Sequence, residues 1–298
     1  MQFTNMFNLP SQFVDAAKSE HTYTPKRYSV TSLLKGSCEA VLQRRHDDEI
    51  VQDVSDMVWL IFGTAVHKIL EEGREEDTEL KECWISMDVP GTDGYVMSGQ
   101  FDSYNDRTGL LTDWKTASVW KVQFNDWEDY RTQLLYYCVL MRANGFNAHA
   151  GQVVALLKDW SATKAETDRD YPQHPVFIIG WEYTESELRA AEAAILKKFA
   201  EIAVAEATPD ADLIPCSPEE RWEKSAKYAV KKKGNVRASK LCDTEEEALA
   251  IVSELEEANP KVKYEVEHRP AEYTKCTKYC TVTRWCPFYQ KEIADAGE

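Results

Sequence analysis

The order of helix-type and strand-type segments between residues 58 and 143 is the feature that most constrains the fold of this chain. Residues 58–72 have apolar side chains at helical spacing, and the stripe that we expect to be buried comprises Leu60, Ala65, Val66, Ile69 and Leu70. Three β-type runs bounded by turn residues follow, at residues 83–89, 95–104 and 109–115. Residues 127–143 again have a helical pattern. The order helix, three strands, helix predicts an α/β domain.

The chain after this core continues the α/β pattern and then changes composition. Runs at residues 151–157 and 176–183 predict two further strands. Thr184 begins the sequence T-E-S-E, a capping-box-like start of a long alanine-rich helix that ends near Ala207. From Pro209 the segment is rich in proline and aspartate, which predicts a hinge.

The residues beyond the hinge predict a small ββαβ module. Two short β-type runs flank KKKGN and indicate a hairpin, which is followed by an amphipathic helix capped by Asp243 and a strand at residues 263–267. The last segment is rich in cysteine and aromatic residues. We therefore expect three parts, at residues 1–208, 209–272 and 273–298.

Composition restricts the class of protein. The 298 residues include 51 acidic and 35 basic side chains, a formal net charge of -16 that argues against a uniformly basic nucleic-acid-binding surface. No apolar run approaches the roughly 20 residues that a membrane helix requires, and the N-terminus lacks a secretion signal, so we expect a cytoplasmic protein. In a reducing cytoplasm, clusters among its 8 cysteines bind metal more often than they form disulfides.

Two acids and a lysine lie on neighbouring predicted strands. Asp113 and Lys115 are two residues apart in TDWKT, so both point to the same face of the sheet. Asp102, in SGQFDSY, can approach that face from the next strand. Two close carboxylates suit Mg²⁺ or Mn²⁺, which can activate a water and polarise a phosphodiester oxygen. The lysine can position the water or stabilise negative charge in the transition state.

The two predicted helices add further polar side chains. His67 on the first helix can supply a nitrogen ligand, and Gln133 and Tyr137 are one turn apart on the second, so they share a face that can be presented to substrate. Taken singly, each of these residues has a common structural role as a turn cap, a core residue or a helix-surface residue. Their combined order within this arrangement of elements is far more specific.

Four motifs in this arrangement resemble those of RecB-like nucleases of the PD-(D/E)XK superfamily. They are G-x-x-x-H, G-Q-F-D, D-W-K and Q-x-x-x-Y, at residues 63–67, 99–102, 113–115 and 133–137. The resemblance implies a restriction-endonuclease-like core, in which a mixed central sheet is flanked by helices. The C-terminal part is similar to that of phage members of the superfamily.

The resemblance also implies roles for the matching residues. The metal ligands would be His67, Asp102 and Asp113. Lys115 would be the catalytic lysine, and Gln133 and Tyr137 would support DNA positioning. The implied activity is that of a Mg²⁺- or Mn²⁺-dependent DNA nuclease, an exonuclease in phage or bacterial recombination, repair or replication. A recombinase, a single-strand-binding protein and a helicase are candidate partners.

A second candidate metal site lies near the C-terminus, where Cys276, Cys280 and Cys286 fall within eleven residues. Such spacing favours metal binding, and a closed site needs a fourth ligand, for which Cys216 and Cys38 are candidates. We favour Cys216 because the surrounding P-C-S-P-E-E-R-W resembles phage members, whereas Cys38 would match iron–sulfur RecB-like nucleases. The spacing is compatible with Zn²⁺ or an iron–sulfur cluster, and the resemblance favours a structural [4Fe-4S] cluster.

Basic residues concentrate in the predicted hairpin. Seven lysines and arginines and no acids lie between residues 224 and 240. The candidate phosphate contacts are Lys231, Lys232, Lys233 and Arg237. A solvated edge protected against aggregation is an equally weighted alternative.

Two other functions remain open from the sequence. The chain could be a non-catalytic DNA-binding or assembly module on the same fold, although the complete set of polar motif residues argues against this. It could also be an RNA nuclease, because nothing in the sequence excludes RNA. Cleavage polarity, strand preference and oligomeric state are not indicated.

Overall fold

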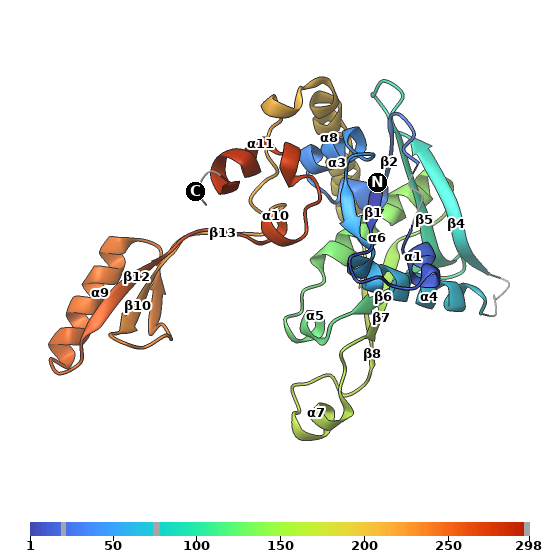
Figure 1. The fold of residues 1–298 in the computed structure, drawn as a ribbon. Helices are drawn as coiled ribbons and strands as arrows, with labels where there is room; N and C mark the ends of the chain where they lie inside the picture. The colour runs from blue at the N-terminus through green and yellow to red at the C-terminus, as the bar shows by residue number, and fades with distance from the viewer. Residues whose placement is uncertain (19–21, 74–77, 295–298) are drawn as a thin grey trace. The chain divides into compact units, whose positions relative to one another are not determined.

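The structure is a computed structural model that describes residues 1–18, 22–73 and 78–294. These residues form two compact units, Met1–Leu213 and Ile214–Glu298 (Figure 1). The last four residues of the predicted cysteine-rich segment, 295–298, lie outside the described residues.

The first unit is built on a mixed six-stranded sheet with the order β2-β5-β6-β7-β8, in which β4 also pairs with β5. Its strands are β2 (Arg27–Ser29), β4 (Glu79–Asp88), β5 (Val96–Asn105), β6 (Leu110–Ala117), β7 (Ala150–Leu157) and β8 (Val176–Glu182). β2 with β5 and β6 with β7 are parallel pairs, and the others are antiparallel. The predicted mixed sheet is confirmed.

Helices flank both faces of this sheet, and the main ones are α3 (Ser37–Arg45), α4 (Val58–Glu71), α6 (Glu128–Ala143) and α8 (Glu185–Ala207). Gln133 on α6 reaches Asp113 of β6. On α4, Gly63 lies against Thr116 of the same strand. Because alternate residues of a strand face opposite sides, α4 and α6 cover opposite faces. α8 packs on α6 and on α3 and begins with the predicted Thr184 capping box.

The main hydrophobic core lies between the sheet, α6 and α8, and includes Tyr104, Leu111, Leu134, Val153 and Phe199. It fills the face of the sheet toward which Asp113 points, because Leu111 and Asp113 alternate with Thr112 along β6. No helix within the described ranges is both long and apolar enough to cross a membrane.

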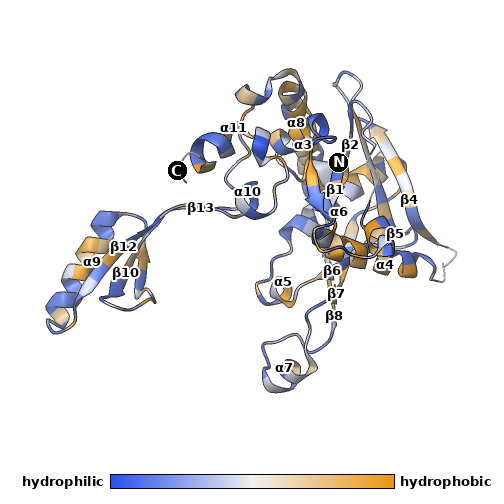
Figure 2. Ribbon diagram, in the orientation of Figure 1, coloured by the Kyte–Doolittle hydropathy of each residue, from blue (hydrophilic) through white to orange (hydrophobic). Residues whose placement is uncertain are grey.

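The predicted buried stripe of α4 is wrong. No residue of this helix is buried, and Leu60 and Ile69 are 48% and 69% exposed. Figure 2 shows how hydrophobic the helix nevertheless is. Helical spacing places apolar residues on one face, but it does not tell whether another element covers that face. The main contacts of α4 are with β6, η1 (Val54–Met57) and α1 (Ser11–Ala17).

The second unit contains the predicted ββαβ module. Its elements are β10 (Lys227–Lys232), β11 (Lys240–Cys242), α9 (Glu245–Ala258) and β12 (Tyr264–Arg269). The strands form an antiparallel sheet in the order β11-β10-β12, and α9 packs on it around Val230, Cys242 and Ala248. The helix is capped by Thr244 and not, as predicted, by Asp243, whose carboxylate instead accepts a hydrogen bond from Lys227.

The C-terminal segment begins at a second, two-stranded sheet in this unit. β9 (Glu223–Lys224) pairs with β13 (Glu272–Tyr273), and the short helices α10 (Thr274–Lys278) and α11 (Pro287–Tyr289) follow. The three clustered cysteines lie on or next to these two helices.

Candidate active site

The candidate active site lies where β5 and β6 separate. Their antiparallel pairing joins residues 103–105 to residues 110–112 and ends one position before Asp102 and Asp113. Beyond this point the backbone N–H of Trp114 donates a hydrogen bond to Oδ2 of Asp102, at 2.7 Å. The Asp102 carboxylate therefore accepts a hydrogen bond from the β6 backbone at a position where the backbone of β5 no longer pairs with β6. Both acids are thus held on ordered strands at the point where a gap opens.

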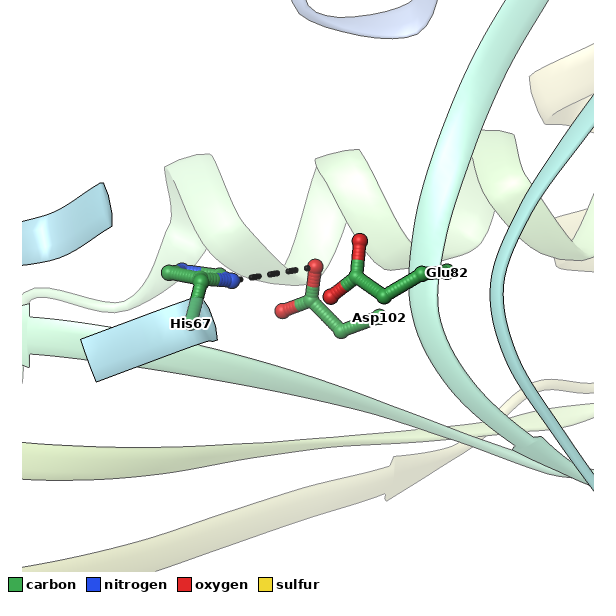
Figure 3. A group of neighbouring side chains, drawn as sticks. All are labelled: His67, Glu82 and Asp102. Carbon is green, nitrogen blue, oxygen red and sulfur yellow. Dashed lines mark ion pairs between the residues drawn. The ribbon is translucent and has the colours of Figure 1, made fainter. Parts of the chain in front are cut away.

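Three side chains from three elements converge beside this gap. His67 of α4, Glu82 of β4 and Asp102 of β5 each offer a ligand atom, and all three atoms lie within 4.8 Å of one another (Figure 3). His67 Nδ1 is 3.5 Å from Asp102 Oδ1. One imidazole nitrogen and two carboxylates are a donor set suited to a divalent cation such as Mn²⁺ or Mg²⁺. The residues present therefore fit the metal that the sequence predicts.

Glu82 was not predicted from the sequence. The β-type run appeared to begin at Cys83, and no recognised motif contains Glu82. In the structure the β4–β5 pairing continues on both sides of it, at Lys81 and Cys83, while Glu82 itself has a left-handed φ of 47°. Its carbonyl accepts a hydrogen bond from Gln100 Nε2 at 3.1 Å. Such a conformation is costly for a non-glycine residue and is concentrated at functional sites. No feature of the sequence predicts this conformation of Glu82.

Asp113 and Lys115 meet on one face of β6, as their spacing predicts. Lys115 Nζ lies 2.8 Å from Oδ1 and 2.7 Å from Oδ2 of Asp113. Burial raises the pKa of Asp113, and the nearby Asp102 carboxylate adds to the shift. Burial also disfavours the Lys115 ammonium, but the Asp113 carboxylate outweighs this and raises the pKa of Lys115. The lysine is therefore held as a cation beside the two acids.

Gln133 and Tyr137 of α6 are buried behind these acids. Gln133 Nε2 donates to Oδ1 of Asp113 at 3.3 Å, and the Tyr137 hydroxyl donates to the carbonyl of Gln100 at 2.7 Å. A Cβ on Gly99 would lie 2.6 Å from the Tyr137 ring, so this glycine lets the ring pack against β5. Both helix residues orient parts of the site from within the protein rather than from an exposed face.

The charges around the three convergent side chains favour a cation. The hydrogen bond with Asp102 raises the pKa of His67, and burial together with Asp102 raises the pKa of Glu82. A pocket of about 170 Å³ adjoins Glu82 and Asp102 and is also lined by Glu71, Glu79 and Lys81. Acidic side chains outnumber basic ones in this set, which makes the local field attractive to a metal ion.

Three cysteines of the second unit, Cys216, Cys276 and Cys286, lie close enough together to interact. Burial raises the pKa of Cys276 to about 11, and the thiols of Cys286 and Cys216 add to the shift. Arg221 donates to the Cys216 carbonyl, and its guanidinium lies 4.0 Å from the centre of the Phe288 ring. The chain around Cys216 is thus tied to the C-terminal cysteine segment. Cys38 is buried on α3 of the first unit.

The lysine-rich hairpin is less basic than its sequence indicates. Lys231 donates to Glu267 and lies 3.4 Å from Glu265, both on the neighbouring strand β12. The pairing of β10 with β12 places Glu265 opposite Lys231, and Glu267, opposite Ala229, reaches the lysine diagonally. The exposed cations at the tip are Lys232, Lys233 and Arg237.

A family model described as the PD-(D/E)XK nuclease superfamily matches residues 64–287. The match covers every motif residue of the first unit from His67 onward, as well as the cysteines at 276, 280 and 286. No curated protein sequence matches the chain significantly.

Among solved structures, SSO0001 has a TM-score of 0.48 and 14% identity, covering 64% of this chain and 83% of its own. The alkaline exonuclease LHK-Exo from Laribacter hongkongensis has a TM-score of 0.38 and 12% identity, over 61% of this chain and 90% of its own. A phage-related exonuclease from Haemophilus somnus 129PT has a TM-score of 0.28 and 9% identity, over 58% and 75%.

Proposed function

The chain belongs to the PD-(D/E)XK nuclease superfamily, and from this membership and the geometry of its site we propose that it is a metal-dependent DNA exonuclease. Membership of this superfamily supports a nuclease that hydrolyses phosphodiester bonds. The observation that carries the proposal is the convergence of His67, Glu82 and Asp102 beside the Asp113–Lys115 pair. A metal-binding donor set next to a partly buried lysine is what phosphodiester hydrolysis requires.

The proposed metal ligands are His67, Asp102 and Asp113, with Glu82 as a further ligand. A bound Mg²⁺ or Mn²⁺ would lower the pKa of a bound water and polarise a phosphodiester oxygen. In this structure the Asp113 carboxylate accepts hydrogen bonds from Lys115 and Gln133. A bound metal would therefore compete with the lysine for that carboxylate.

Lys115 is proposed to act on the substrate phosphate. Its raised pKa keeps the ammonium charged, so it can donate to an oxygen on which negative charge develops. Gln133 bonds Asp113, and Tyr137 bonds the β5 backbone at Gln100, two residues before Asp102. These two contacts keep the acids on their strands, which preserves the alignment that catalysis requires.

The direct test incubates end-labelled linear DNA and closed circular DNA with the protein in Mg²⁺, Mn²⁺ or EDTA. We expect the linear substrate to be degraded in either metal, the circle to survive, and EDTA to stop the reaction. Asp113→Ala and Lys115→Ala should abolish cleavage while circular dichroism shows an unchanged fold. Cleavage by both variants at the wild-type rate would contradict the assignment, and cleavage of the circle would contradict the exonuclease.

We also propose that Cys216, Cys276, Cys280 and Cys286 hold a structural [4Fe-4S] cluster, with Zn²⁺ as the alternative metal and Cys38 as the alternative fourth ligand. The link through Arg221 between Cys216 and the C-terminal segment supports the first set. Cys216→Ser should lower the bound iron, whereas Cys38→Ser should not. A colourless preparation with stoichiometric zinc would contradict the cluster.

The proposed setting is the cytoplasm of a bacterium or a phage-infected cell, in recombination, repair or replication. A recombinase, a single-strand-binding protein or a helicase are the partners expected there. Co-purification of the tagged protein from such cells tests this part. Recovery of none of the three classes would contradict the proposed partners.

A further inference from the structure

Two aromatic rings are exposed directly after β6, the strand that carries Asp113 and Lys115. Trp120 and Phe124 lie on and just after α5 (Val119–Gln123), which follows β6 after a single residue. Their rings are stacked, with centroids 4.9 Å apart and planes within 6° of parallel. They are 62% and 66% exposed. Side chains this exposed contribute little to the hydrophobic core. Core packing therefore does not explain why two large aromatic rings are stacked at this surface.

A chain of aromatic and basic side chains connects these rings to the catalytic lysine. Lys121, next to Trp120, has its Nζ 4.2 Å from the centre of the Tyr130 ring. Lys115 Nζ is 5.4 Å from the centre of the same ring. Tyr130 therefore lies between the lysine of the site and the lysine beside the stacked pair. A series of contacts through Tyr130 thus leads from the stacked pair to the proposed reaction centre.

A second aromatic–lysine pair flanks the same end of β6. Lys158 Nζ lies 3.9 Å from the centre of the Trp59 ring on α4. The backbone N–H of Lys158 bonds to the carbonyl of Ala117, and the next residue, Asp159, accepts from the backbone of Val119 at 2.7 Å. Lys158 and the start of α5 are thus joined at the end of β6. On each side of this end an exposed aromatic ring thus lies near a lysine, and Lys121 is also ion-paired with Asp129 at 2.7 Å.

We propose that Trp120 and Phe124 are a stacking platform for the bases of an unpaired DNA strand that leads into the metal site. The inference rests on the proposed function and names its substrate class, DNA with a single-stranded stretch. Aromatic rings stack on bases of any sequence, and neighbouring lysines attract the phosphates between them. Bases of an intact duplex are already stacked and paired, so such a platform is of use only on an unpaired strand.

The experiment compares two probes of equal length and charge. Fluorescence anisotropy in EDTA, which prevents hydrolysis, measures binding of the full-length protein to labelled oligothymidylate and to a strand of abasic sugar–phosphate residues. We expect the wild type to bind oligothymidylate more tightly by about tenfold or more. The double variant W120A/F124A should bind the two probes equally, whereas Trp120→Phe should keep the preference.

Phe7→Ala provides a control, because Phe7 is another exposed aromatic residue of the first unit and makes none of the ring and lysine contacts described above. It should bind like the wild type. Equal binding of both probes by the wild type would overturn the platform, even if the double variant failed to fold. A preference that survives in W120A/F124A would also overturn it, and would leave these rings to a protein partner.

The wild type is also tested for hydrolysis of linear DNA in Mg²⁺. This second assay distinguishes a failure of the proposed platform from a failure of the proposed nuclease activity. Hydrolysis without a base-dependent preference overturns the platform alone. A base-dependent preference that W120A/F124A loses supports the platform, and the absence of hydrolysis in the same preparation overturns the nuclease.

Discussion

At the scale of single residues, two neighbours of Asp102 determine how its carboxylate is presented. Gly99 admits the Tyr137 ring to β5, and Glu82 turns its backbone to a left-handed φ opposite Asp102. The sequence predicted that Asp102 lies on one strand and that Asp113 and Lys115 share a face of the next, because strand alternation is a local property. It did not locate Glu82, because a left-handed residue inside a strand is imposed by the surrounding fold and has no local signature.

The two motif glycines should respond differently to the same substitution. A Cβ at Gly99 would lie 2.6 Å from Tyr137, whereas at Gly63 it would meet only Thr116 Oγ1 at 3.7 Å. We expect Gly99→Ala to lower the free energy of unfolding by about 1–3 kcal/mol. Gly63→Ala should be neutral or stabilise by up to about 1 kcal/mol through helix propensity. Urea denaturation measures both, and equal effects would contradict the packing described.

Removing the charge of Glu82 should weaken metal binding. The loss of one of the convergent oxygen ligands in Glu82→Gln should lower the affinity for Mn²⁺ by about tenfold or more, measured by titration calorimetry. Asp88→Asn is the matched control, because Asp88 is an exposed acid at the far end of the same strand. Similar affinities of the two variants would exclude Glu82 as a ligand.

At the scale of elements, the strands from β4 to β8 and the helices α4, α6 and α8 followed from hydrophobic periodicity, but the edge strand β2 did not. The capping box at Thr184 was confirmed in detail. The exposure of α4 did not follow, since periodicity reports which residues share a face and not what lies against it. Contacts between elements distant in sequence were also invisible. An example is the end of α3, where Arg45 Nη2 bonds the carbonyls of Ala205 and Glu206 at the end of α8.

The contact between α3 and the segment after α8 should depend on pH. His46, at the end of α3, bonds Asp210 at 2.6 Å and Glu49 at 2.7 Å. Burial lowers the pKa of His46, but these two carboxylates outweigh it, so the pKa is raised above 6.5. A raised folded-state pKa means that the stabilisation is complete below about pH 6.5 and is lost as pH rises through the folded value.

Urea midpoints at pH 6 and at pH 8.5 test this contact. The wild type should lose stability between pH 6 and pH 8.5. Asp210→Asn should lose less, because in this variant His46 no longer interacts with one of its two carboxylates. Asp212→Asn, a change at an exposed neighbour, should behave like the wild type. A wild-type midpoint that does not fall would contradict the assignment.

At the scale of the whole molecule, the net charge of -16 is a poor guide to substrate. Some of the acids converge on the candidate metal site, and others neutralise bases that the sequence had singled out, as Glu265 and Glu267 do for Lys231. The sequence shows the hairpin lysines without their cross-strand partners, because register between β10 and β12 depends on tertiary pairing.

The hairpin should contribute to DNA affinity through its exposed tip. Changing Lys232, Lys233 and Arg237 together to Ala should reduce the slope of log affinity against log salt by about 0.9 for each phosphate that is no longer neutralised. Lys231→Ala should change the slope less, because that lysine is already paired. Anisotropy over a range of salt concentrations measures both. An unchanged affinity and slope in the triple variant would exclude the hairpin from DNA binding.

The proposed function requires that hydrolysis occurs at a metal held beside the gap between β5 and β6. Its most direct test is the rate of linear DNA hydrolysis as Mn²⁺ is added back to metal-free protein, for the wild type and for Asp102→Asn. We expect a wild-type rate that rises from zero to saturation, and no hydrolysis by the variant at the same concentrations. Hydrolysis by the metal-free wild type, or the same curve for Asp102→Asn, would contradict the proposed metal site.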